Sequence, residues 1–124
     1  MKKVMLFVAL MLAFFSVQVN VALANKAETS IKGPAEAAKG SEVTLQVTST
    51  HNANTASHYT EWLKVTANRK ESNRWDYTKE NRPEGAVFSK EIKIKVTEDT
   101  EIVAESSCNI HGSKGPITHK ISVK

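Results

Sequence analysis

The chain has 124 residues, of which 24% are charged, and its formal net charge is +4 at pH 7. This length suits one domain with a single core, and the weak positive charge does not by itself indicate a nucleic-acid partner. The lysines of KEIKIKV alternate with apolar residues, as on the solvent side of a strand, and no basic stripe carries interleaved aromatic residues. We therefore expect a small single-domain protein that does not bind nucleic acid.

The first 24 residues have the pattern of a secretory signal peptide. Lys2 and Lys3 precede an apolar run over residues 4–15, and Ala22 and Ala24 stand at the −3 and −1 positions of a small-residue cleavage site. The rival interpretation is a membrane anchor, but the run is about a dozen residues, shorter than the roughly 20 that a spanning helix needs. No cysteine for a lipid anchor stands at the cleavage site. We expect cleavage after Ala24, an exported domain of residues 25–124 without a stable membrane anchor, and a periplasmic location, with secretion as the alternative.

The exported part shows the period-two alternation of half-buried strands. In EVTLQVT, for example, Val43, Leu45 and Val47 alternate with polar residues. The segment between Pro34 and Gly40 has helical propensity but is only one turn long. The pattern, with turns about every eight to twelve residues, predicts an all-β fold, an immunoglobulin-like β-sandwich of about seven strands. The predicted strands are 28–32, 42–48, 59–67, 74–78, 88–96, 100–107 and 117–123.

Cys108 is the only cysteine, so it has no partner for an intramolecular disulfide. A single thiol in an exported protein indicates a partner chain, a reactive role or a metal ligand. The alternative is a buried, inert cysteine that acts as a small apolar side chain. His111 follows three residues later, on a turn, so that both side chains can reach one ion.

Two further histidines, His51 and His58, flank a polar loop between two predicted strands. Loops from distant parts of the sequence meet at one end of a Greek-key sandwich, so these imidazoles can converge with Cys108 and His111. A thiolate with imidazoles is a donor set for a transition metal, although ordinary surface histidines are the simpler interpretation. His119 lies in the last predicted strand, either as a structural, partly buried histidine or as one more imidazole at the site.

The stretch HYTEW, residues 58–62, followed by CNIHG, residues 108–112, resembles the iron domain of superoxide reductases, the desulfoferrodoxin and neelaredoxin family. The resemblance implies an immunoglobulin-like sandwich and a mononuclear non-haem iron, Fe(II) or Fe(III), held by four equatorial histidines and one axial thiolate. Cys108 would be the axial ligand and the catalytic residue, and His51, His58 and His111 would be equatorial ligands. The implied substrate is superoxide, reduced to hydrogen peroxide, and an external donor that the sequence does not name must re-reduce the iron.

The chain differs from the family pattern in the fourth histidine, which normally comes from an early E-K-H segment. No histidine precedes His51 here, and six residues rather than five separate His51 from His58. With three imidazoles a second position on the iron is open. We therefore expect iron binding to persist and superoxide reduction to be slower or absent, in which case the protein would handle or sense iron.

Two other functions remain open from the sequence. A cupredoxin-like copper electron carrier is also an exported sandwich of this size. Such a carrier usually has an axial methionine ligand, but the methionines here, Met1, Met5 and Met11, all lie in the predicted signal peptide. The other function is a metal-binding module without catalysis. The oligomeric state is not indicated by the sequence.

Overall fold

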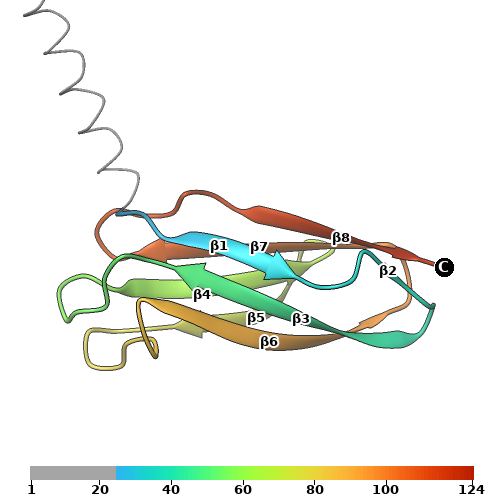
Figure 1. Ribbon diagram of the computed structural model, residues 1–124, viewed down its shortest axis with the longest axis horizontal. Helices are drawn as coiled ribbons and strands as arrows, with labels where there is room; N and C mark the ends of the chain where they lie inside the picture. The colour runs from blue at the N-terminus through green and yellow to red at the C-terminus, as the bar shows by residue number, and fades with distance from the viewer. Residues whose placement is uncertain (1–24) are drawn as a thin grey trace, which may run out of the picture.

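The computed structural model describes residues 25–124, so the predicted signal peptide lies outside the described part of the chain. This part is all-β, and the sheets stack as two layers (Figure 1). No helix among the described residues is long and apolar enough to cross a membrane. The strands are β1 (Glu28–Lys32), β2 (Glu36–Ala37), β3 (Ser41–Thr50), β4 (Thr60–Ala67), β5 (Lys70–Asp76), β6 (Val87–Val96), β7 (Thr100–Cys108) and β8 (Ile117–Val123).

The sandwich consists of a three-stranded sheet, in the order β1-β3-β6, and a five-stranded sheet, in the order β2-β8-β7-β4-β5. All pairs are antiparallel except β2 with β8, which is parallel. The predicted immunoglobulin-like sandwich is therefore confirmed. The inward side chains of both sheets form one apolar core, which comprises Ala37, Val43, Leu45, Val47, Leu63, Val65, Phe88, Ile92, Val96, Ile102, Ala104 and Ile121.

Two segments differ from the sequence prediction. Residues 36 and 37, expected to have helical propensity, form the short strand β2, because Ala37 is buried in the core and pairs with Val123 of β8. Strand β5 begins four residues earlier than expected. Asn68 and Arg69 both have positive φ, 47° and 71°, and make the tight turn that joins β4 directly to β5.

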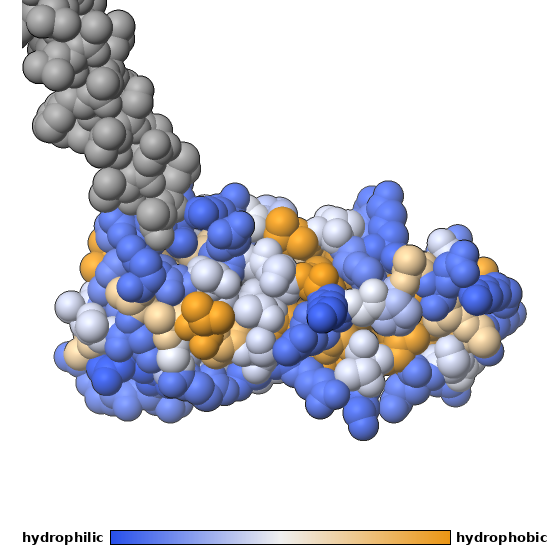
Figure 2. Space-filling view, viewed as in Figure 1, coloured by the Kyte–Doolittle hydropathy of each residue, from blue (hydrophilic) through white to orange (hydrophobic). Residues whose placement is uncertain are grey.

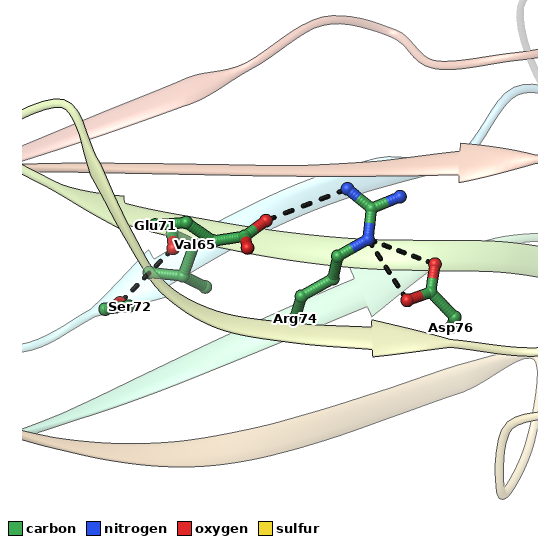
Figure 3. Close-up of polar contacts among 5 residues, drawn as sticks. All are labelled: Val65, Glu71, Ser72, Arg74 and Asp76. Carbon is green, nitrogen blue, oxygen red and sulfur yellow. Dashed lines mark hydrogen bonds and ion pairs between the residues drawn. The ribbon is translucent and has the colours of Figure 1, made fainter.

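Strand β5 is a free edge of the five-stranded sheet and carries charged side chains. Arg74 contacts Asp76, with Nε 3.1 Å from the carboxylate, and its Nη1 lies 3.7 Å from Glu71 Oε1 (Figure 3). Ser72 donates a hydrogen bond of 3.2 Å to the carbonyl of Val65 on the neighbouring strand. These ion pairs are exposed and add little stability, but charges on an edge discourage pairing with another chain. Hydrophilic residues also cover most of the face of the molecule that Figure 2 shows.

A layer of buried hydroxyl groups lies between the apolar core and one end of the sandwich. Ser106 on β7 bonds to Thr29 on β1 at 2.8 Å and to Ser49 on β3 at 2.9 Å. The three residues are 0–3% exposed. Side chains on a strand alternate, so the next inward position beyond Ser49 is His51 and the next beyond Ser106 is Cys108. The inward faces of β3 and β7 therefore continue from the core to the predicted site.

Candidate metal centre

The four predicted site residues lie at one end of the sandwich, where β3 and β7 end and β4 begins (Figure 1). His51 directly follows β3, and its backbone N–H donates a 3.0 Å hydrogen bond to the carbonyl of Ala86. Cys108 is the last residue of β7 and pairs with Thr60, the first residue of β4. The register of this pair shifts between Thr60 and Trp62, an irregularity common beside functional sites. His51 and Cys108 are 3% and 2% exposed, so both are inward-facing.

The CNIHG turn holds the sulfur of Cys108 in place. The backbones of Cys108 and Gly112 exchange two hydrogen bonds, of 2.9 and 3.1 Å. Gly112 adopts a φ of 79°, which side chains disfavour, and this closes the turn. The backbone N–H groups of Ile110 and His111 each donate to the sulfur at 3.4 Å. These two N–H groups fix the direction in which the sulfur points.

Asn109 joins this turn to the loop that carries His58. Its side-chain oxygen accepts a 3.0 Å hydrogen bond from the backbone N–H of Tyr59, and its side-chain nitrogen donates to the carbonyl of Ser57 at 3.2 Å. His58 is therefore fixed on both sides relative to Cys108. Asn109 is not among the site residues that the sequence predicts. An asparagine directly after a candidate ligand in a tight turn is the signal that points to it.

The donor atoms of His51, His58 and Cys108 lie within 4.8 Å of one another. His111 joins them through Nδ1, which is 3.1 Å from Nε2 of His58 and 3.7 Å from the sulfur of Cys108. The three rings meet edge to face, with centroids 4.6 Å apart for His51 and His58 and 4.9 Å apart for His58 and His111. The structure thus brings together residues from three separate segments of the sequence.

The donor set and its spacing fit a metal ion. Two ligand atoms that are each about 2.1 Å from one metal ion, with a right angle between the two bonds, lie about 3.0 Å apart. The nitrogen atoms of His58 and His111 already have this spacing, at 3.1 Å. A soft thiolate with several imidazoles suits iron, copper or zinc rather than calcium or magnesium. The donors of His51, His58 and Cys108 are close enough to form such a site.

Burial lowers the pKa of His51, which suits a metal ligand. Desolvation lowers the pKa of His51 below 6.5, the hydrogen bond to the Asn25 carbonyl opposes this shift, and His58 and His111 lower the pKa further. The neutral ring keeps a lone pair available for a metal at neutral pH.

The lowered pKa of His51 predicts acid-sensitive stability of the metal-free chain. The unfolded chain binds a proton at this residue near pH 6.5, and the folded chain binds it only at lower pH. The stabilising contribution is therefore complete above pH 6.5 and is lost as the pH falls below it, by at most about 1.4 kcal/mol per pH unit. Urea unfolding between pH 7.5 and 5.5, with a chelator present, measures this. His51→Asn should flatten the dependence, and an unchanged pH dependence in that variant would contradict the assignment.

His119 lies away from the centre. It pairs with Ile102 on β7, six residues before Cys108, which corresponds to about 20 Å along a strand. Its Nε2 is 2.9 Å from the carbonyl of Pro34, so the ring bridges β8 to the segment before β2. The structural interpretation of His119 fits this position, and a fourth imidazole from His119 does not.

We expect His119→Ala to leave metal affinity unchanged within about threefold, since no ligand is removed. Loss of the hydrogen bond to Pro34 should lower the free energy of unfolding by about 0.5–1.5 kcal/mol. Metal titration and urea unfolding of the same sample separate the two effects. His51→Ala is the matched comparison, because it removes a histidine of the cluster. A large loss of metal affinity in His119→Ala would contradict the placement.

Solved structures similar to this chain support the fold assignment. A variant of superoxide reductase (neelaredoxin) from Ignicoccus hospitalis is 18% identical, with a TM-score of 0.67 over 84% of this chain and 86% of that one. A candidate superoxide reductase from Thermotoga maritima is 22% identical, with a TM-score of 0.59 over 78% and 86%. The CARDB domain of a Pyrococcus furiosus protein, in complex with di-metal ions, is 14% identical, with a TM-score of 0.60 over 79% and 87%.

These identities establish the shared sandwich and nothing finer, since unrelated functions occur on one fold. No curated protein is similar enough in sequence to match this chain. The desulfoferrodoxin family model matches residues 20–113, which include His51, His58, Cys108 and His111. Because the match covers most of the chain and all four residues of the centre, this protein belongs to the desulfoferrodoxin family.

Proposed function

We propose that the chain holds one non-haem iron through His51, His58, His111 and Cys108 and reduces superoxide to hydrogen peroxide. The proposal depends on one observation: the donor atoms of His51, His58 and Cys108 lie within 4.8 Å of one another, although Cys108 is far from both histidines in sequence. Membership of the desulfoferrodoxin family supports iron as the metal.

Bound iron would supply one electron, and superoxide with that electron and two protons gives hydrogen peroxide. The chain's own residues control access and charge. Cys108 and His51 are buried, so they face the core, whereas His111 is exposed and leaves its side of the centre open to a small anion and to water. The protons come from that water, and an external reductant must return the electron after each turnover.

We further propose that the protein acts outside the cytoplasm, in the periplasm or as a secreted protein. The support is the basic, apolar and small-residue pattern of residues 1–24. A domain stabilised without disulfides, with one thiol committed to a metal, is compatible with an oxidising compartment.

The metal content and visible spectrum of the purified exported chain test the iron assignment. We expect about one iron per chain and, on oxidation, an absorption band from the bond between iron and the Cys108 thiolate. Copper with an intense blue band would instead indicate an electron carrier of the cupredoxin type. A chain that takes up no stoichiometric metal when supplied with Fe(II) would contradict a metal centre altogether.

A further inference from the structure

The carbonyl of Asn25 contacts a residue of the metal centre. Its oxygen is 3.1 Å from Nε2 of His51. In the metal-free protein this is a hydrogen bond. The main chain of Asn25 therefore borders His51, one of the proposed ligands.

The segment that carries Asn25 is fixed to the CNIHG turn. The backbone N–H of Ala27 donates to the carbonyl of Gly112 at 3.2 Å, and the N–H of Lys114 donates to the carbonyl of Ala27 at 2.9 Å. Ala27 is fully buried, and Thr29, the next inward residue, belongs to the buried hydroxyl layer. Asn25 lies two residues before Ala27, in a turn, and is partly buried.

The side chain of Asn25 is held by a different contact. Its Oδ1 accepts a 2.6 Å hydrogen bond from Nδ2 of Asn52, which is exposed. This bond fixes the orientation of Asn25 through its side chain and leaves the main-chain atoms for the centre.

Cleavage after Ala24, which the sequence predicts, would change the chemistry of this residue. The peptide nitrogen of Asn25 has no free lone pair, since it takes part in the amide bond. After cleavage it is a primary amine and a good ligand for a borderline metal.

We propose that the amino terminus of Asn25, exposed by cleavage, supplies a fourth nitrogen donor to the metal beside the three imidazoles. The amine nitrogen is the donor, so one position on the metal stays open for superoxide. This inference rests on the proposed function, because it requires the metal at His51, His58, His111 and Cys108. It couples export to assembly, since the chain acquires its complete ligand set only when the signal peptide is removed.

The test compares three forms of the chain with Co(II) as the probe metal. The first begins at Asn25 with a free amine, the second is the same chain acetylated at that amine, and the third begins at Ala24. We expect the first to bind Co(II) at least about tenfold more tightly than the other two, the lower end of what loss of one supporting group costs a metal site. Co(II) should also protect the amine of the first form from acetylation, followed by mass spectrometry.

Two further measurements sharpen the outcome. Asn25→Ala with a free amino terminus should keep its affinity within about threefold, because it retains the main-chain amine; a large loss would assign the donor to the side-chain amide and overturn the proposal. Equal affinities of the three forms, with an amine that stays reactive, would overturn it and leave the iron centre intact. If no form binds Co(II) or Fe(II), the proposed function fails as well. Thermal unfolding of the three metal-free forms controls for folding.

Discussion

Replacing Cys108 with serine is expected to abolish the iron–thiolate absorption band and to weaken iron binding by more than about 100-fold, beyond what loss of an outer supporting group costs. The band requires a sulfur ligand, and the serine hydroxyl stays protonated at neutral pH, so it is a poor ligand. The two N–H groups of Ile110 and His111 that face the sulfur would then face a neutral oxygen. Serine has nearly the volume of cysteine, so the sandwich should remain folded.

Ser107→Ala is the matched control for this substitution. Ser107 is the neighbouring residue on β7, is also buried at 7% exposure, and makes only a long 3.4 Å contact with the carbonyl of Cys108. Alternation on the strand directs its side chain to the opposite face. The control should keep both the band and the metal. A Cys108→Ser chain that retained the iron and its thiolate band would show that the sulfur is not a ligand.

The iron-loaded chain is expected to react with superoxide more slowly than the diffusion-limited range of about 10⁸–10⁹ M⁻¹s⁻¹. Three imidazoles lie at the centre, and His119 is about 20 Å away along the sheet. A fourth donor at Asn25 would stand at the very end of the exported chain, two residues beyond the anchored Ala27, where only an exposed side-chain bond to Asn52 holds it. The position would then be open part of the time, and two adjacent open positions favour reaction with peroxide. Mixing the Fe(II) protein with a superoxide pulse and following iron oxidation measures the rate.

The acetylated chain supplies the comparison for this reaction. If Asn25 is a donor, acetylation should slow the reaction with superoxide further and increase bleaching of the thiolate band by added peroxide. If it is not, both chains should behave alike. A rate near the diffusion limit in the unmodified chain would show that three imidazoles and Cys108 suffice for the chemistry.

The alternation of apolar and polar residues was sufficient to predict the sandwich. Val43, Leu45 and Val47 face inward as expected, because a strand with one buried face must alternate with period two. The same alternation places His51 and Cys108 on inward faces, since each continues a row of buried side chains beyond the core. The close spacing of Cys108 and His111 on one turn also depends only on local geometry. The sequence determined these features because they follow from neighbouring residues along a single strand or turn.

Contacts between distant segments were decided by the tertiary structure. Residues 36 and 37 form β2 only because the edge of β8 offers unpaired backbone groups and the core accepts Ala37. His119 alternates like an inward residue, yet the register of β8 on β7 places it beside Ile102 and far from Cys108. Asn109 and Asn25 gain their roles from partners at least 25 residues away, Ser57 and His51. Local propensity contains no information about register or loop docking, because the packing of the whole domain fixes both.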